Sequence, residues 1–480
     1  MKRTLAWLLT NLLSGSTVAQ TKSDSKSQQL VFTHVTVIDV AARDSEHALK
    51  TDQTVIISGT RIATVGKRIR APKGALVIDA TGEYLIPGLW DMHVHTLSKG
   101  LPDLFFPLFV ANGVTGVRDM GGDIPLQQIS RIKREITSEA RLGPKIVAAG
   151  PILEGARPFW SFSIPVKDAS EGKRAVDELV ENGADFIKVY NTLSREAYVA
   201  IAEEARQKQI SFVGHVPDGM SSLEASRAGQ KSIEHLWSIP VDVCRDAETL
   251  RSRTSQANAE ENPAKARDLF FGINQDILTH YDEVKAANLF REFAANGTWQ
   301  TPTLTVLRAY AWIHNSSLRA DPRIAYIPPG IRNFWGSMGG QPDPRNDKIQ
   351  NQLFEHDLEI VAALHRAGVK VLAGTDTPNP YTYPGFSLHE ELELLVKAGF
   401  TPLEALQSAT INPARFLNLE NTLGTVEKGK IADLVLLDAN PLDSIGNTRR
   451  IFAVVTNGRY LPKSYLRKML ADVEAAASKK

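Results

Sequence analysis

The sequence has little that would mark a disulfide-stabilised, nucleic-acid-binding or membrane protein. Its 480 residues include one cysteine, Cys244, so an intrachain disulfide cannot form and a cysteine-rich zinc module is excluded. The 55 Lys and Arg residues nearly balance the 54 Asp and Glu residues, which gives no reason to expect nucleic acid or an anionic membrane as partner. A hydrophobic content of 43% with 23% charged residues instead indicates a globular chain with a substantial core.

The signatures of three common hydrolase classes are also missing. The sequence contains no Gly-x-Ser-x-Gly and no His-Glu-x-x-His, and Cys244 lies in no catalytic signature. The sequence therefore offers no motif that would indicate a serine hydrolase, a zincin protease or a cysteine hydrolase.

The first nineteen residues have the layout of a secretory signal peptide. Lys2 and Arg3 precede an apolar stretch, and small residues end the segment, with Thr17 and Ala19 placed for cleavage after Ala19. This stretch is too short to span a bilayer, and no apolar run of about 18 residues follows it. We therefore predict an exported protein, periplasmic or secreted, without a membrane partner.

Short β-rich runs occupy both ends of the remaining chain. Residues 30–85 alternate such runs with turns, and residues 421–465 repeat this character, with Asn457-Gly458 as a hairpin signal. We predict one small β-sandwich domain built from both ends; the alternative is two independent end caps.

The middle of the chain, residues 86–420, alternates short apolar strands with amphipathic helices. Eight such alternations, without a glycine-rich dinucleotide loop after the first strand, favour an α/β fold of the (β/α)₈ TIM-barrel type over a doubly wound sheet. The spacing between the sixth and eighth strands is too long for ordinary units and predicts an insertion at about residues 240–348. The eight predicted strands lie at residues 90–95, 114–119, 145–149, 186–190, 211–216, 232–236, 298–306 and 370–376.

Two histidines share one face of the first strand. Side chains two apart on a strand project together, so His93 and His95 are placed to chelate one divalent ion. The alternative is a pair of hydrogen-bonded structural histidines.

Other strands end in residues of the same ligand type. Lys188, His215, His235 and Asp376 each lie just before the loop that follows their strand, where the carboxyl end of a barrel carries its active site. Lys188 is unusual because a lysine among apolar strand residues is costly to bury without a partner. Carboxylation of its amine by CO₂ would turn it into an anionic bridging ligand; the alternative is an unmodified lysine paired with Asp376 or another carboxylate.

With these residues identified, the chain resembles the amidohydrolase superfamily. Residues 87–95 are similar to its opening signature and residues 424–434 to its closing signature. The resemblance covers nearly the whole chain outside the signal peptide and the insertion, and is greatest to the imidazolonepropionase-like and Xaa-Pro dipeptidase-like (prolidase-type) branch. Lys188 favours the dipeptidase side, because imidazolonepropionases bind one ion without such a lysine. The intervening motifs match at residues 186–190, 214–216, 233–236 and 374–377.

This resemblance implies a binuclear metal centre, with zinc as the default pair of ions. His93, His95 and Asp376 would bind one ion, His215 and His235 the other, and carboxylated Lys188 would bridge them. A hydroxide between the ions would attack an amide bond of a peptide-like or N-acyl amino acid substrate. Asp376 would act as general base and then as general acid toward the leaving amine.

Three further residues are candidates for binding the small-molecule substrate. Tyr190 shares the strand face of Lys188 and would contact a substrate carboxylate or the oxyanion. Arg118 would anchor an anion or simply pair with Asp119, and Arg157 would form the charged rim of a pocket.

Two other functions fit the same ligands. A lactonase or esterase would use an identical centre, and a non-catalytic metal-binding protein would not need the carboxylate of Asp376 as a proton shuttle. The sequence leaves open the substrate, the identity of the metals and whether the chain forms a homo-oligomer.

Overall fold

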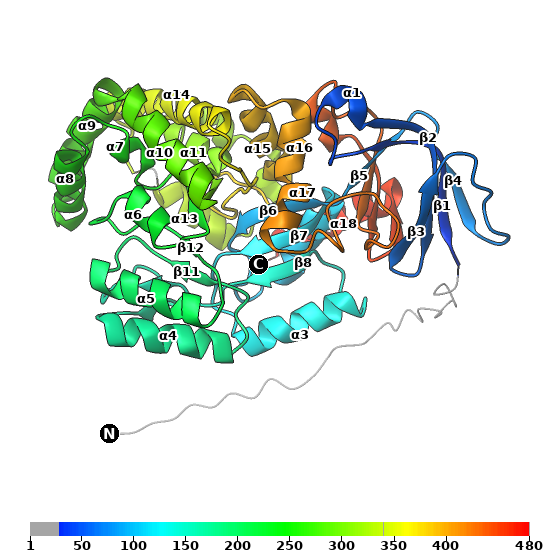
Figure 1. Cartoon of the computed structure of the whole chain (residues 1–480), viewed down its shortest axis with the longest axis horizontal. Coiled ribbons are helices and arrows are strands. Elements are labelled where there is room, and N and C mark those ends of the chain that lie inside the picture. The colour runs from blue at the N-terminus through cyan, green and yellow to red at the C-terminus, as the bar shows by residue number, and fades with distance from the viewer. Residues whose placement is uncertain (1–27, 339, 480) are drawn as a thin grey trace.

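The computed structural model describes residues 28–338 and 340–479, so the predicted signal peptide lies outside the described residues. Figure 1 shows a β-rich part at one end, built from the first strands, beside a larger part in which strands and helices alternate. No helix of the described residues combines the length and hydropathy needed to cross a bilayer.

Strands from both ends of the chain pair in one eight-stranded sheet. The order is β17-β16-β15-β5-β1-β2-β3, with β4 pairing β1. The junction between the chain ends is antiparallel, with Leu434 opposite Pro87 and Leu437 opposite Tyr84. The strands are β1 (Leu30–Ile38), β2 (Leu49–Ser58), β3 (Arg61–Gly66), β4 (Leu76–Asp79), β5 (Tyr84–Pro87), β15 (Leu434–Leu437), β16 (Ile451–Thr456) and β17 (Arg459–Pro462).

This sheet closes over its own hydrophobic core. Alternate residues of β1, such as Leu30 and Phe32, pack with Leu434 and Leu436 in a cluster separate from the main core. An antiparallel bridge joins Arg61 on β3 to Ile431. Strand β3, at one end of the sheet order, thus meets the segment just before β15.

The larger part contains two parallel sheets. The first has the order β6-β7-β8 and the second the order β10-β9-β11-β12-β13-β14. Parallel strands joined by helices and buried on both faces are typical of α/β folds, and every residue of β6 and β7 is buried. The strands are β6 (Leu89–Val94), β7 (Val114–Asp119), β8 (Lys145–Ala148), β9 (Leu153–Glu154), β10 (Ile164–Pro165), β11 (Ile187–Val189), β12 (Phe212–Gly214), β13 (Ser232–Glu234) and β14 (Trp299–Thr301).

The segment predicted as the eighth strand joins these sheets through single bridges. Val371 bridges to Gln300 of β14, and Thr377 bridges to Val94 of β6, both in parallel. On the other side, Asp185 N donates to Ala148 O at the end of β8. The arrangement is an α/β fold with parallel sheets, consistent with a TIM barrel beside an extra domain.

Helices return the chain between the strands. Two of those expected from the sequence begin at side-chain caps, where Asp168 accepts from Glu171 N and Ser194 accepts from Ala197 N. The connecting helices are α2 (Pro102–Ala111), α3 (Leu126–Thr137), α4 (Ala169–Glu181), α5 (Arg195–Gln207), α6 (Ser222–Arg227), α10 (Glu283–Asn296), α14 (Pro344–Arg366), α15 (Phe386–Lys397), α16 (Pro402–Ser408) and α17 (Ile411–Phe416).

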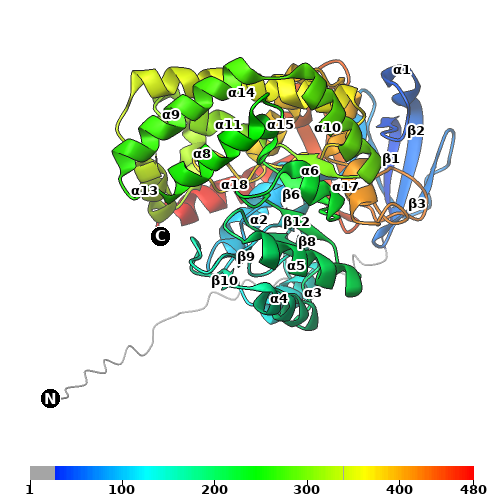
Figure 2. The ribbon, with the colours of Figure 1, turned by 60° about the vertical axis from the view of Figure 1, so that its left-hand side comes forward.

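Residues 240–348 do not form a single continuous insertion, because β14 lies inside this range and belongs to the parallel sheet. Additional helices lie on either side of it, and Figure 2 shows α8, α9 and α13 gathered at one side of the molecule. These helices are α7 (Ile239–Asp242), α8 (Ala247–Ala259) and α9 (Pro263–His280) before β14, and α11 (Leu304–Ala311), α12 (Ser316–Arg319) and α13 (Pro329–Met338) after it.

The chain ends in a helix that the sequence analysis did not predict. Helix α18 (Lys463–Ala477) buries Leu466, Met469 and Val473 in the main hydrophobic core. It contacts α2 and the last two strands of the β-sheet, so it ties the two parts of the molecule together.

Candidate active site

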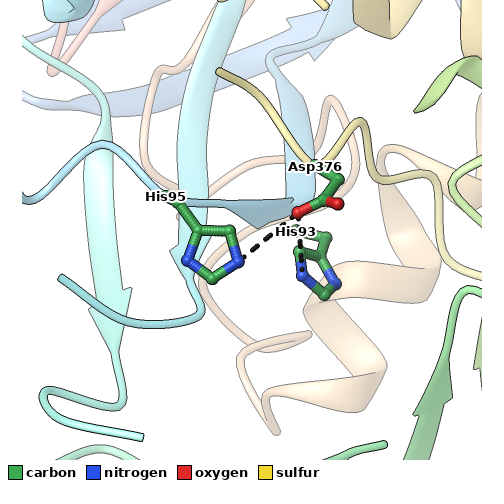
Figure 3. A group of neighbouring side chains, drawn as sticks. All are labelled: His93, His95 and Asp376. Atoms are coloured by element: carbon green, nitrogen blue, oxygen red, sulfur yellow. Dashed lines mark ion pairs between the residues drawn. The ribbon is translucent and has the colours of Figure 1, made fainter. Parts of the chain in front are cut away.

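Three predicted ligands meet at the carboxyl ends of the parallel strands. The ligand atoms of His93, His95 and Asp376 all lie within 4.8 Å of one another. Figure 3 shows both imidazoles pointing toward the Asp376 carboxylate, and each Nε2 lies 3.4 Å from its Oδ1. His93 is completely buried, whereas His95 is partly open to solvent. This group is a candidate site for a divalent ion.

Asp91 holds the two strand ends that carry these ligands. Its carboxylate accepts from His93 N at 3.3 Å, from Thr375 N at 3.0 Å and from Thr375 Oγ1 at 2.7 Å. Asp376 N in turn donates to His93 O at 2.7 Å. Gly374 permits this close approach, since a Cβ there would lie 2.8 Å from His93 Cβ.

A buried ion pair fixes the ring of His93. Its Nδ1 lies 2.8 Å from Glu234 Oε2, and Arg118 Nη2 donates to both oxygens of the same carboxylate at 2.9 and 3.0 Å. All three side chains are buried. With Nδ1 engaged by the carboxylate, Nε2 is the nitrogen left for a metal, which is how ligand histidines are usually oriented.

His95 is fixed by the loops that follow β6 and β7. Its Nδ1 lies 2.9 Å from Gly121 O, which again leaves Nε2 toward Asp376. The buried Asp119 carboxylate accepts from Thr96 N at 2.7 Å and from Leu97 N at 3.0 Å, and so holds this loop against β7.

The other three predicted ligands adjoin this group. The His235 ring lies 4.4 Å from that of His93 and 5.1 Å from that of His215, and His235 Nε2 lies 3.9 Å from Asp376 Oδ2. Thr303 Oγ1 engages His235 Nδ1 at 2.6 Å. The buried Lys188 on β11 is close enough to influence the charge of His93, His215 and His235. All six strand-end residues therefore converge on one region.

Buried polar atoms without hydrogen bonds fit a metal centre at this position. Lys188 Nζ, His93 Nε2, His215 Nδ1 and Asp376 Oδ1 are buried and have no hydrogen-bond partner among the described residues. Burying such atoms unpaired is costly, and nitrogen and oxygen donors of this kind suit zinc and similar divalent ions. The residues present thus fit the metal that the motifs predict.

The electrostatics of the site favour the ligand forms of His93, His215 and Asp376, whereas the pKa of His95 is raised because the Asp376 carboxylate outweighs the effect of burial. Burial lowers the pKa of His93 and His215 well below the usual range, so both imidazoles are neutral. Burial also lowers the pKa of the Lys188 amine to about 8. Burial would raise the pKa of Asp376, but the neighbouring His235, His95 and Lys188 hold it below its ordinary value, so the carboxylate is ionised.

The backbone is strained at several of these positions. His235, Thr303 and Asp376 have φ angles of 58°, 49° and 58°, a left-handed conformation that side chains other than glycine rarely adopt. Such strain is maintained only where the surrounding structure enforces it, and it concentrates at functional sites.

A cavity of about 510 Å³ opens above the metal candidate, with His95, His215, His235 and Asp376 in its floor. Its walls are largely aromatic and come from different parts of the chain. The loop after β9 supplies Phe159, Trp160 and Phe162. Tyr190 and Trp237 come from the loops after β11 and β13. Helices α11 and α13 supply Tyr310 and Phe334.

The substrate candidates have different positions. Tyr190 lines the cavity and stacks on His215 with ring centroids 4.2 Å apart. Arg118 does not reach the cavity, because its buried guanidinium is engaged by Glu234 rather than by a ligand or by Asp119. Arg157 is exposed on the loop and is not among the residues lining the cavity. The structure thus pairs Arg118 with Glu234 instead of Asp119 and has neither arginine lining the cavity, and their role toward a substrate stays a prediction.

Sequence reasoning missed the residues that support the ligands. Asp91 and Glu234 were passed over although each lies one or two residues from a predicted ligand, and Asp119 was considered only as a partner of Arg118. An acidic residue on an otherwise apolar buried strand was the available signal, since buried carboxylates require partners.

Comparison with known proteins agrees with this geometry. Residues 84–461 match the model of the amidohydrolase family. An imidazolonepropionase from Pseudomonas fluorescens is 24% identical over 416 residues, covering 84% of this chain and 92% of the relative.

Two solved structures share the fold. A Xaa-Pro dipeptidase with bound methionine in the active site superposes with a TM-score of 0.64 and 20% identity, over 91% of this chain and all of that one. The bottromycin amidohydrolase gives a TM-score of 0.72 and 22% identity, over 94% and 90% of the two chains. The resemblance inferred from the motifs is confirmed, and the chain belongs to the amidohydrolase family as a hydrolase of C–N bonds.

Proposed function

We propose that this protein is an exported, binuclear metal-dependent amidohydrolase that cleaves a peptide-like or N-acyl amide bond. The observation that carries the proposal is the Asp376 carboxylate, held between two histidines at the floor of a cavity large enough for a substrate. Its amide-bond chemistry accords with membership of the amidohydrolase family.

Six side chains would hold the ions. His93, His95 and Asp376 form one ligand set, and His215 and His235 form the other. Carboxylated Lys188 would join them, a role supported by its buried amine without a hydrogen bond. Its pKa of about 8 leaves a fraction of neutral amine at neutral pH, the form that reacts with CO₂. Divalent ions bound there would supply Lewis acidity and lower the pKa of bound water.

Asp376 is placed to move the proton that hydrolysis requires. Its Oδ1 faces both histidines, while its carboxylate also borders the cavity where the scissile bond would lie. A carboxylate there accepts a proton from the attacking water and donates it to the leaving amine. Tyr190, in the wall beside this floor, has its pKa raised by burial to about 12, so its hydroxyl is protonated and can donate to the substrate oxygen.

The test is release of amine from a panel of dipeptides and N-acyl amino acids and their amides by zinc- and bicarbonate-supplemented protein. Release that disappears on chelation and in Asp376→Asn supports the proposal. Release that persists unchanged in Asp376→Asn contradicts the role of Asp376, and hydrolysis of lactones or esters without amides contradicts the bond assigned.

The exported location is supported by the sequence of residues 1–19 alone. Expression of the full chain in a Gram-negative host should yield a mature N-terminus at Gln20 in the periplasmic fraction. A cytoplasmic product that retains Met1 would contradict export without affecting the chemistry.

A further inference from the structure

We propose that Tyr190 and Trp237 are positioning residues that hold the imidazole of His215 between them, and that this contact determines how firmly the second ion is bound. The inference rests on the proposed function, which assigns His215 and His235 to that ion. It adds Trp237, which belongs to neither ligand set, to the residues on which the metal centre depends.

His215 differs from the other predicted ligand histidines in how its ring is held. Each of the other three has its Nδ1 engaged by a hydrogen-bonding group of the surrounding structure. Neither nitrogen of the His215 ring has such a partner among the described residues, and its Nδ1 is buried. Because no hydrogen bond orients this imidazole, only packing can restrain it. The groups that engage the others are Glu234 for His93, Gly121 O for His95 and Thr303 for His235.

Two flat rings supply the restraint on His215. The ring centroid of Tyr190 lies 4.2 Å from that of the imidazole, at an interplanar angle of 29°. The ring centroid of Trp237 lies 4.5 Å from it, at 14°. Two rings stacked on the same face would contact each other, and within residues 28–338 and 340–479 no ring contact joins Tyr190 to Trp237. The two rings therefore cover opposite faces of the imidazole and fix its plane.

The chain turns sharply after β13 to place Trp237 on His215. His235, Leu236 and Ser238 have φ angles of 58°, 55° and 71°, so the residues on both sides of Trp237 are in the left-handed region. This conformation is costly for side chains other than glycine and persists only where the surrounding structure enforces it. The turn follows the strand that leads to one ligand and lays the indole over the ligand at the end of the neighbouring strand, β12.

Trp237 contributes little to the hydrophobic core in this position. Its side chain is only partly buried, and it borders both the active-site cavity and a second cavity of about 290 Å³. A side chain that borders two cavities is not tightly packed on all sides, so its replacement should remove the contact with His215 without unfolding the chain.

The expected consequence is a difference between the two ions. Loss of the group that orients a ligand histidine typically lowers metal affinity by about 10–100-fold. Here the loss falls on the second ligand set, because Trp237 stacks on His215. The first ion, which His93, His95 and Asp376 would bind, should stay in place.

Zinc retention by two replacements of Trp237 tests the proposal. Trp237→Leu keeps an apolar side chain but removes the flat ring, whereas Trp237→Phe keeps a flat ring. Protein supplied with zinc and bicarbonate is dialysed at a series of buffered free zinc concentrations, and elemental analysis measures the bound zinc. We expect Trp237→Leu to lose the second ion at about ten-fold higher free zinc than the parent, and Trp237→Phe to recover most of this difference. Parental retention by Trp237→Leu, or equal loss in both variants, would overturn the inference.

Trp312→Leu is the matched control, because it makes the same replacement outside the active-site cavity, where Trp312 contacts Phe354. It should leave zinc retention unchanged, and thermal melting verifies that each variant is folded. If Trp237 were only a wall of the cavity, Trp237→Leu would raise KM for the substrate without altering zinc retention, which would contradict the inference. Equal zinc loss in Trp312→Leu would also contradict it.

A second measurement separates the inference from the proposed function, because it does not require zinc. The ring currents of two stacked aromatic rings shift the proton resonances of the enclosed imidazole upfield. In histidine-labelled protein the signal of His215 is identified by its absence in His215→Gln. We expect this signal to move downfield in Trp237→Leu and much less in Trp237→Phe. Such a movement in a protein that binds no zinc would contradict the proposed function and support the positioning of His215, whereas an unmoved signal would overturn the inference.

Discussion

The floor and the walls of the cavity are built on opposite principles. The floor is polar, and buried hydrogen bonds beneath it hold the ligands in place. Glu234 contacts His93 and accepts from Arg118, and Asp91 accepts from the backbone of Thr375. The walls are apolar and come from loops and added helices, with Phe159 and Phe334 partly in solvent. The difference indicates that the floor determines the reaction and the walls determine the substrate, as expected when loops vary on a fixed scaffold.

The largest effect should follow from replacing Asp376, the carboxylate that we propose transfers the proton. Asp376→Asn keeps the size of the side chain but loses its basicity, so we expect kcat to fall by about 10²–10⁴-fold, with the thermal unfolding midpoint little changed. Steady-state amine release and thermal melting measure the two. An Asp376→Asn variant with the parental kcat would show that Asp376 does not transfer the proton.

Loss of the Lys188 amine should come next. Lys188→Gln cannot be carboxylated, and we expect fewer bound ions and at least about a hundred-fold lower activity, because loss of a mere supporting partner already costs 10–100-fold. Elemental analysis of the purified protein measures the ions. Lys231→Gln is the matched control, since its half-buried amine bonds Phe416 O away from the ligands. Equal metal content in Lys188→Gln and the parent would show that Lys188 is not a ligand.

A smaller effect is expected from the support beneath His93. Glu234→Gln retains the shape but weakens the hold on His93 Nδ1 and leaves buried Arg118 without its anionic partner. We expect metal affinity or activity to fall by about 10–100-fold, together with reduced stability. Glu234→Asp keeps the charge but moves the carboxylate away from His93 Nδ1, so it should restore only part of the activity. If metal affinity is unaffected while stability falls, Glu234 acts in folding alone.

The smallest effect should come from the wall. Phe334→Ala removes one partly exposed ring from α13, so we expect KM for an aromatic amide to rise by about three- to ten-fold with kcat retained. A small acyl amide such as N-acetylglycinamide should show no change in KM. A fall in kcat comparable to that of Glu234→Gln would contradict the assignment of substrate binding to the walls and of the reaction to the floor.

The same division separates what sequence reasoning could predict from what it could not. The six predicted ligands could be picked out because each lies near a strand end with a recognisable pattern, and the structure brings His93, His95 and Asp376 together. The partner of Arg118 could not be predicted, because the same position on a strand can face the cavity or the interior and only the fold shows that Glu234 lies opposite. The aromatic walls of the cavity depend on contacts between residues far apart in the chain, such as Trp335 with Pro378, which no local pattern contains.

Two further differences have similar causes. The range 298–306 was predicted as one strand, but β14 ends at Thr301 and α11 begins at Leu304, because Thr303 turns the chain with a positive φ. Helix α18 was missed because its apolar positions have meaning only against α2 and the β-sheet, which the sequence could not place beside it.

The most direct test of the account measures bound metal and amide hydrolysis on the same protein before chelation, after chelation and after metal is restored. The account predicts about two divalent ions per chain, activity that disappears with the ions, and recovery when zinc and bicarbonate are added. Undiminished amide hydrolysis by the metal-free protein would contradict the central claim that the group formed by His93, His95 and Asp376 is a metal-dependent catalytic site.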